Sequence, residues 1–371
     1  MIPGYATQEG TFSYAKRFPS FSKDYFTPAN ELFTASVGIG SFMPEPYKED
    51  NYTYSLKEVI EEAVRNGTNM IDTAANYRYQ MSEREIGEAL KELLDEGYKR
   101  EELIIGSKAG FLQLDFPFPK DPYVWIDETI VKSGLATKEE IITDQHCLTP
   151  AYLRWSLEQS LKNLGIETLD IFYIHNPEIQ LGYISYEELM DRLEAAFVLC
   201  EALVKEGKIR NYGIASWNGF LYQEGDMEYL GFNDIMERVQ KAGGSNHRFR
   251  YIELPFNLAK AHAFSYTNQK GPDGRYYTML QMVQNYGLCA VGSSSLLQMN
   301  LFKKAFNRDV SELLGPEEMT DIHRALQFGR SAKGIVSSLF ATIRPEHAKD
   351  NLLIGHMPKV DGQNYQKIFG L

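Results

Sequence analysis

The stretch SLKEVIEEAVRNGTNMIDTA, residues 55–74, contains one complete helix-to-strand unit. Ser55 and Glu58 have the spacing of a capping box, in which two side chains satisfy free backbone N–H groups at a helix start. Apolar residues then recur at helical spacing: Leu56, Val59, Ile60, Ala63 and Val64. Asn66-Gly67 is typical of a left-handed helix end. The apolar run that follows at once, and that Asp72 closes, predicts a buried strand.

The same order of signals recurs along the chain. Capping boxes at Ser82 and Ser185, and an N-cap with proline at Thr149-Pro150, predict three more helix starts. Strands are predicted at 34–40, 68–74, 103–110, 169–177, 208–217, 249–257, 287–295 and 334–342. Helices that alternate with strands indicate a parallel sheet, because parallel neighbours need a crossover connection.

Eight such units predict a (β/α)8 barrel of the TIM type. A doubly wound parallel sheet is the alternative, but no GxGxxG follows any strand and no change in composition divides the chain. We therefore predict one barrel domain at residues 31–357, an N-terminal arm at 1–30 and a C-terminal tail at 358–371. A long insertion, 111–147, follows the third strand. Its aromatic residues either line the barrel mouth or pack on the outside: Phe111, Phe116, Phe118, Tyr123 and Trp125.

The composition is that of an ordinary globular protein, with 43% hydrophobic and 24% charged residues among 371. A formal net charge of -12 argues against nucleic acid as a partner, since phosphate binding needs clustered Lys and Arg. No apolar run reaches the roughly 18–20 residues of a membrane span, and no signal-peptide pattern is visible. Cys147, Cys200 and Cys289 are widely spaced, which predicts reduced thiols and no metal site. Together these features predict a cytoplasmic protein without a membrane or nucleic-acid partner.

Polar side chains close several of the predicted strands. Asp72, Lys108 and His175 end three consecutive strands, and Ser216 and Asn257 end two more. Each has an ordinary structural interpretation: a helix cap, a solvated lysine or a hydrogen-bonded histidine. However, the C-terminal ends of barrel strands meet at one mouth, where barrel enzymes place their catalytic groups. We therefore expect these side chains to form one site.

Several motifs, in this order, resemble those of the aldo-keto reductase family. They are IDTAANY (71–77), SEREIGEAL (82–90), GSKAG (106–110), LDIFYIHNPE (169–178), GKIRNYGIASW (207–217), LPFN (254–257) and RPEHAKDN (344–351). The similarity covers roughly residues 32–355. The fold of this family is the (β/α)8 barrel, so the resemblance agrees with the fold that the periodicity predicts.

The resemblance implies a catalytic tetrad of Asp72, Tyr77, Lys108 and His175. It implies an NAD(P)(H)-dependent oxidoreductase that interconverts a carbonyl compound (an aldehyde, ketone or sugar) and its alcohol, with Tyr77 as general acid/base. Lys108 would lower the tyrosine pKa, ordinarily about 10, and Asp72 would orient the lysine. His175 would hydrogen-bond the carbonyl oxygen. The spacing from Asp72 in the family motif selects Tyr77 over Tyr79.

The resemblance also implies NADP, or else NAD, as the cofactor. The residues implied to bind it are Gly40, Ser41, Asp72, Ser216, Trp217, Asn218, Glu253, Ser293, Ser294, Leu296, Thr342, Arg344, His347 and Asn351. Three positions depart from the family pattern: Trp217 stands where Asn is usual, Glu253 where Gln is usual, and Ser293 where a stacked aromatic is frequent. A carboxylate at 253 cannot donate to the nicotinamide carboxamide oxygen.

Two other functions fit the same residues. One is a non-catalytic, nucleotide-sensing regulatory subunit on the same barrel. The other is an aldolase that uses Lys108 as a Schiff-base amine. For the oxidoreductase, the expected partner is a small carbonyl or alcohol substrate.

Overall fold

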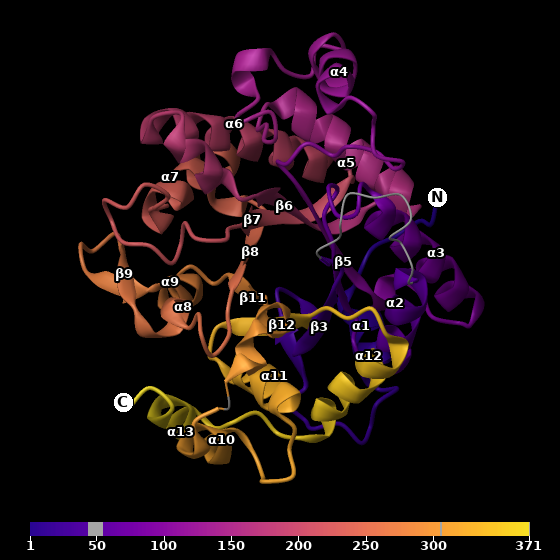
Figure 1. The fold of residues 1–371 in the computed structure, drawn as a ribbon, viewed down its shortest axis with the longest axis vertical. Helices are drawn as coiled ribbons and strands as arrows, with labels where there is room; N and C mark the ends of the chain where they lie inside the picture. The colour runs from indigo at the N-terminus through magenta and orange to yellow at the C-terminus, as the bar shows by residue number, and fades with distance from the viewer. Residues whose placement is uncertain (44–54, 305, 371) are drawn as a thin grey trace.

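Eight parallel strands form a closed barrel in the computed structural model, which describes residues 1–43, 55–304 and 306–370 (Figure 1). In chain order they are β3 (Val37–Gly40), β4 (Met70–Asp72), β5 (Ile104–Ala109), β6 (Leu169–His175), β7 (Ile209–Ala215), β8 (Phe249–Pro255), β11 (Cys289–Ser293) and β12 (Ile335–Phe340). The last strand, β12, pairs with the first, β3. The predicted barrel is thus confirmed. The doubly wound alternative is wrong, because that sheet would have two unpaired edges.

Helices surround the barrel (Figure 1). The principal ones are α2 (Leu56–Arg65), α3 (Met81–Asp95), α5 (Pro150–Leu164), α6 (Tyr186–Lys205), α7 (Phe232–Gly243), α9 (Met279–Asn285), α11 (Asp321–Ser331) and α12 (Pro345–Leu352). Further helices are α1 (Gln8–Ala15), α4 (Pro122–Ile126), α8 (His262–Ser265), α10 (Arg308–Leu314) and α13 (Gly362–Lys367). The apolar faces of the principal helices are buried in one continuous core, which explains their 3.6-residue periodicity.

Three of the four predicted helix starts are confirmed, with side-chain caps at Ser55, Thr149 and Ser185. The capping box predicted at Ser82 is wrong. Helix α3 begins at Met81, and Ser82 lies buried in its first turn, where its hydroxyl donates to the Ser41 carbonyl. The carboxylate of Glu85 binds Arg78 instead of closing a box, with Nη1 and Oε2 2.9 Å apart.

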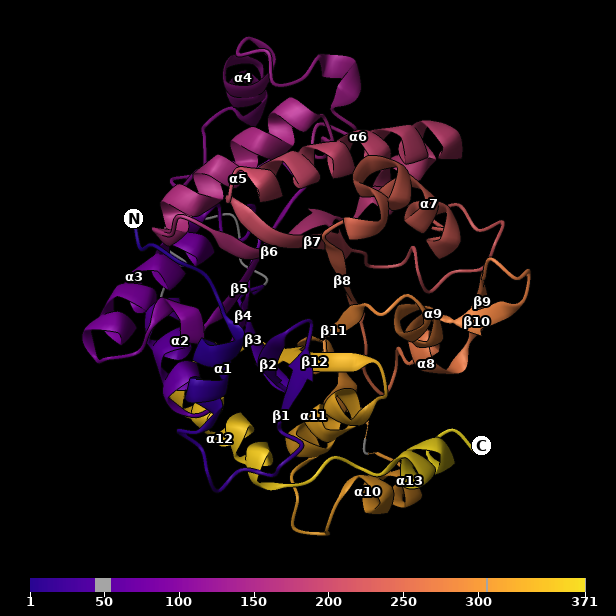
Figure 2. The ribbon, with the colours of Figure 1, turned by 180° about the vertical axis from the view of Figure 1, so that it is seen from behind.

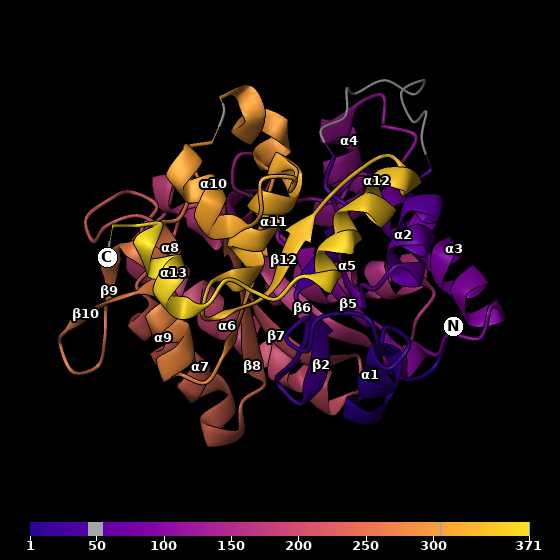
Figure 3. The same ribbon diagram turned by 90° about the horizontal axis from the view of Figure 1, so that it is seen from below.

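An antiparallel hairpin of β1 (Phe26–Ala29) and β2 (Leu32–Ala35) lies across the N-terminal end of the barrel (Figure 2). Ala29 and Leu32 pack there against inward-facing strand residues, including Met70 and Ile104. Figure 3 shows the hairpin and α1 on the side of the barrel away from α4 and α10. The predicted arm, 1–30, therefore contains α1 and β1, and the described part of the predicted tail contains α13. The end of the barrel that the hairpin does not cover carries the polar strand ends.

A second hairpin, β9 (Thr267–Lys270) with β10 (Tyr276–Thr278), lies outside the barrel and is not among the predicted strands. Within the described ranges no helix is long and apolar enough to cross a membrane, and no group of His, Cys, Asp and Glu could hold a metal ion. The three cysteines are free and buried, as the sequence predicts.

Candidate functional site

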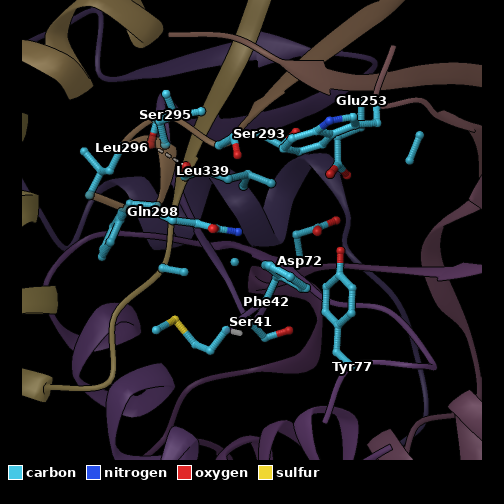
Figure 4. A pocket seen from close by; sticks show the side chains of 18 of the residues that line it. Ser41, Phe42, Asp72, Tyr77, Glu253, Ser293, Ser295, Leu296, Gln298 and Leu339 are labelled. Atoms are coloured by element: carbon cyan, nitrogen blue, oxygen red, sulfur yellow. Dashed lines mark hydrogen bonds between the residues drawn. The ribbon is translucent and has the colours of Figure 1, made fainter. Parts of the chain in front are cut away.

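A cavity of about 510 Å³ lies at the C-terminal ends of the barrel strands (Figure 4). Strand-end residues of seven strands line it: Gly40, Asp72, His175, Ala215, Glu253, Ser293 and Phe340. The loops that follow the strands complete the wall, among them those of Tyr77, Phe111 and Trp217. Figure 4 shows Tyr77 and Glu253 on one side of the cavity and Leu296 and Gln298 on the other. Its volume is that of a small-molecule site.

A buried ion pair lies under this wall. The Nζ of Lys108 donates to Asp72 Oδ1 and to the Thr73 carbonyl, the latter at 2.9 Å, and it lies 3.2 Å from Glu253 Oε2. Parallel pairing of β4 with β5 sets Asp72 opposite Gly106, where a Cβ atom would lie 3.1 Å from Asp72 Oδ2. Burial favours the neutral amine, but the two carboxylates outweigh it and hold the pKa of Lys108 above its ordinary value.

Tyr77 follows β4 in a short turn and lines the cavity. Its ring centroid lies 5.6 Å from Lys108 Nζ and 5.9 Å from the centroid of the His175 ring. Burial raises the pKa of Tyr77 above its ordinary value, and the charge of Lys108 offsets only part of that rise. Lys108 therefore lowers the pKa of Tyr77, as the resemblance implies. The net pKa nevertheless lies above the ordinary tyrosine value, which is opposite to the implied lowering. Tyr79 does not line the cavity, and its ring packs against Phe118, with centroids 4.9 Å apart.

His175 ends β6 and is neutral. Burial, together with the charge of Lys108, lowers its pKa well below the ordinary value. A neutral imidazole has one N–H donor and one acceptor nitrogen. Within the described chain, the buried Nδ1 has no hydrogen-bond partner. The side chain can therefore present a donor to an oxygen in the cavity without carrying charge itself.

The insertion is anchored beside this histidine. Its His146 Nε2 lies 2.7 Å from the carbonyl oxygen of His175. Gly110, with φ +152°, allows that approach, because a Cβ there would lie 2.6 Å from the same oxygen. The two ends of the insertion are also joined, since Leu112 N donates to Gln145 O at 2.7 Å. His146 lacks a recognisable motif and is not among the residues predicted for the site.

The five aromatic residues of the insertion have different positions. Phe111 lines the cavity, with its ring centroid 5.0 Å from that of His175. Trp125 packs on the barrel core, and Tyr123 is 69% exposed. Both predicted arrangements therefore occur, the lining one at Phe111 and the external one at Trp125.

The loop after β7 is held by a carboxylate that the sequence prediction omits. Glu178 Oε1 accepts hydrogen bonds from Ser216 Oγ at 2.8 Å, Trp217 N at 2.6 Å and Asn218 N at 3.0 Å. Glu178 follows His175 by three residues, inside the quoted HNPE motif, which was the available signal. The Asn218 amide donates to Glu228 at 2.8 Å and does not line the cavity.

Other predicted cofactor residues do line the cavity. They are Gly40, Ser41, Asp72, Ser216, Trp217, Glu253, Ser293, Ser294 and Leu296. Trp217 is 39% exposed and lies under Lys260, whose Nζ is 4.5 Å from the centroid of the indole. The neighbouring turn of Leu297, Gln298 and Met299 also lines the cavity in a left-handed conformation, which its sequence without glycine does not indicate.

Four predicted cofactor residues do not line the cavity: Thr342 and Arg344 lie between β12 and α12, and His347 and Asn351 lie within α12. Thr342 and Asn351 are buried, whereas Arg344 and His347 are exposed. Thr342 Oγ1 accepts a hydrogen bond from the backbone N–H of Arg344, the N-cap residue of α12. Thr342 and Arg344 thus lie at the start of α12, next to cavity-lining Ala341, whereas Asn351 lies at the other end of this helix.

Comparisons with known proteins agree with this arrangement. The family model "Aldo/keto reductase family" matches residues 36–311. The NADH-specific methylglyoxal reductase of Escherichia coli is 30% identical over 159 residues, which is 43% of this chain and 40% of that protein. The glycerol 2-dehydrogenase (NADP(+)) of Hypocrea jecorina is 24% identical over 197 residues, 49% of each chain.

Solved structures show the same fold. An aldo/keto reductase from Klebsiella pneumoniae, in complex with NADP and acetate, has a TM-score of 0.59 at 17% identity, with 94% of each chain covered. The match to each of these two curated relatives spans half of the relative's length or less. The family model nevertheless covers most of the barrel and all four tetrad positions. The chain belongs to the aldo/keto reductase family.

Proposed function

We propose that this protein is an NAD(P)(H)-dependent oxidoreductase that interconverts a carbonyl compound and its alcohol, with Tyr77 as general acid/base. The convergence of Asp72, Tyr77, Lys108 and His175 from three strands and one loop supports this function. NADP is the proposed cofactor, with NAD the alternative. Named relatives use both, and Arg344 is an exposed cation without an ion-pair partner in the described chain, as a 2′-phosphate site needs.

The donors and acceptors of the cavity wall fit a nicotinamide carboxamide. Ser216 Oγ donates to Glu178 and accepts from Gly219 N–H at 2.9 Å, which leaves one lone pair to accept from an amide NH₂. Burial and the charge of Asp72 raise the pKa of Glu253 to about 8. A protonated Glu253 could donate to the carboxamide oxygen as a glutamine would. When bound, the nicotinamide supplies or accepts the hydride.

The chain's own residues transfer the proton. In carbonyl reduction, Tyr77 donates its phenolic proton to the oxygen on which negative charge develops. Neutral His175 donates a hydrogen bond to the same oxygen and fixes its orientation. Lys108 stabilises the phenolate that Tyr77 becomes, and Asp72 holds the lysine in place. In alcohol oxidation the phenolate takes the proton back.

The Schiff-base alternative has less support. An aldolase lysine must be neutral and exposed to its substrate. Lys108 is buried, does not line the cavity and is kept charged chiefly by the carboxylate of Asp72. No specific observation favours the regulatory subunit over the enzyme.

The proposed function is tested by titrating the protein with NADPH and NADH while following tryptophan fluorescence. We expect quenching, because Trp217 lines the cavity. Nucleotide consumption is then followed at 340 nm with a panel of aldehydes, ketones and sugars. Binding without turnover would favour the regulatory subunit. Failure to bind either nucleotide would exclude the proposed function.

The raised pKa of Tyr77 predicts a difference between the two reaction directions. A neutral tyrosine is the form needed for carbonyl reduction, and burial preserves it at pH 7. We expect kcat/KM for reduction to stay flat from pH 6 to about 7, below the range in which Glu253 ionises. We expect kcat/KM for alcohol oxidation to rise up to about pH 10, the ordinary tyrosine pKa, and beyond. An oxidation profile that reaches a plateau below pH 9 would show a lowered tyrosine pKa instead.

A further inference from the structure

Glu253 lies beside the buried ion pair, yet the tetrad does not include it. It lies on β8, lines the cavity and is 6% exposed. Its backbone carbonyl accepts a hydrogen bond from Ser216 N at 2.9 Å, which fixes β8 against the loop after β7. Its Oε2 lies 3.2 Å from Lys108 Nζ. One buried lysine therefore lies between two carboxylates, Asp72 and Glu253.

The two carboxylates are not equivalent. Asp72 Oδ1 accepts a hydrogen bond from Lys108 Nζ, whereas neither Asp72 Oδ2 nor Glu253 Oε2 makes a hydrogen bond in the described chain. Two buried carboxylates that share one cation cannot both ionise easily, so one of them keeps a proton. The weaker contact of Glu253 with Lys108 assigns that proton to Glu253. Burial raises the pKa of both carboxyl groups, and that of Glu253 rises to about 8.

The other ionisable groups that face Glu253 do not change the assignment of this proton near neutral pH. They are Asp72 from β4, Lys108 from β5, Tyr173 from β6 and Tyr77 from the loop after β4. Burial raises the pKa of both tyrosines above the ordinary value, so both stay neutral while Glu253 titrates. Lys108 Nζ lies 5.6 Å from the ring centroid of each tyrosine.

We infer that Glu253 is a positioning residue that acts on Tyr77 through Lys108, and that its ionised carboxylate counteracts the lysine and keeps the tyrosine protonated. Glu253 is ionised over the range in which Tyr77 titrates, so its charge adds to that of Asp72 and opposes phenolate formation. The consequence is a site in which alcohol oxidation is restrained at alkaline pH. This consequence depends on the proposed function, whereas the coupling between the three side chains does not.

The coupling is tested by NMR titration of the full chain labelled with ¹³C at the tyrosine ring carbon that bears the hydroxyl, with Tyr77→Phe used to assign the signal. We expect Glu253→Gln to lower the midpoint of Tyr77 by about one pH unit, since a nearby charge shifts a pKa by roughly 1–3 units. Glu253→Met removes the same charge and should act likewise. Glu253→Asp keeps the charge, so its Tyr77 midpoint should stay close to that of the natural protein.

Glu178→Gln is the matched control. Glu178 is also a buried carboxyl below the cavity, but it is not among the charges that act on Tyr77. The inference is overturned if the midpoint of Tyr77 is the same in Glu253→Gln and Glu253→Met as in the natural protein. It is also overturned if Glu178→Gln shifts this midpoint as much as Glu253→Gln does.

Kinetics separate this inference from the proposed function. In Glu253→Gln, the alkaline rise of kcat/KM for alcohol oxidation should begin about one pH unit lower. If the Tyr77 midpoint shifts but no nucleotide-dependent activity exists, the inference about the coupling holds and the proposed function fails. If activity exists and the midpoint does not shift, the inference fails and the proposed function holds.

Discussion

Tyr77→Phe should lower kcat for carbonyl reduction by about 10²- to 10⁴-fold, the usual contribution of a positioned general acid. The change removes one hydroxyl and leaves the ring in place. The ring contacts with Phe42 and His175, with centroids at 5.1 and 5.9 Å, should therefore persist. Because the lost proton is needed only as charge develops on the substrate oxygen, KM and nucleotide affinity should change little. Steady-state kinetics measure kcat and KM, and fluorescence titration measures the nucleotide affinity.

Tyr79→Phe is the control for this result. Tyr79 is two residues away on the same loop, but its ring contacts Phe118 and does not line the cavity. Its variant should keep the turnover of the natural protein. If Tyr79→Phe lost activity and Tyr77→Phe did not, the assignment of the acid would be wrong. A Tyr77→Phe enzyme within a factor of about five of the natural one would exclude general-acid catalysis by this residue.

Lys108→Met should lower kcat/KM for alcohol oxidation by about 10- to 1,000-fold at pH 7, because an opposite charge nearby is worth roughly 1–3 pKa units. Without the lysine, burial and the Asp72 and Glu253 charges all act to raise the pKa of Tyr77. The fraction of phenolate falls accordingly, and the start of the oxidation profile moves to higher pH. Kinetics between pH 7 and 11 measure the displacement.

The same substitution leaves Asp72 without its cation in a buried position, which should reduce the free energy of unfolding by about 3–5 kcal/mol. A double variant separates this loss from the loss of chemistry. Lys108→Met with Asp72→Asn removes both charges, so urea unfolding should show partly recovered stability. Activity should stay low in the double variant. If the double variant regained oxidation activity, the role of Lys108 would be purely structural.

The sequence predicts the barrel well because short apolar runs alternate with amphipathic helices, three of which begin at the predicted side-chain caps. It also predicts that Asp72, Lys108 and His175 converge, since each ends such a run and strand ends meet at one mouth. Tyr77 is different. It lies in a loop, and only the resemblance to the family separates it from Tyr79.

The missed features depend on contacts between distant segments or on backbone conformation. His146 binds the carbonyl of His175, and Glu178 binds the loop at Ser216, so neither role has a local pattern. The start of α3 was misplaced because its N-cap, Gln80, has φ +71° and uses no side-chain cap. Local propensity does not indicate a left-handed residue that is neither glycine nor asparagine.

The anchoring of the insertion has a consequence for how this protein could diversify. Its ends are fastened side by side, by Cys147 N to Gly110 O at 2.8 Å and by the bridge between Phe111 and His146. The segment between them is therefore a loop that is closed at its base next to His175, and contacts such as Arg84 Nη2 to Asp115 Oδ1 at 2.6 Å hold it to the barrel helices. Evolution, or an engineer, can exchange the exposed residues of this loop, such as Tyr123, and alter which molecules reach the mouth. The strands that carry Asp72, Lys108 and His175 need not change.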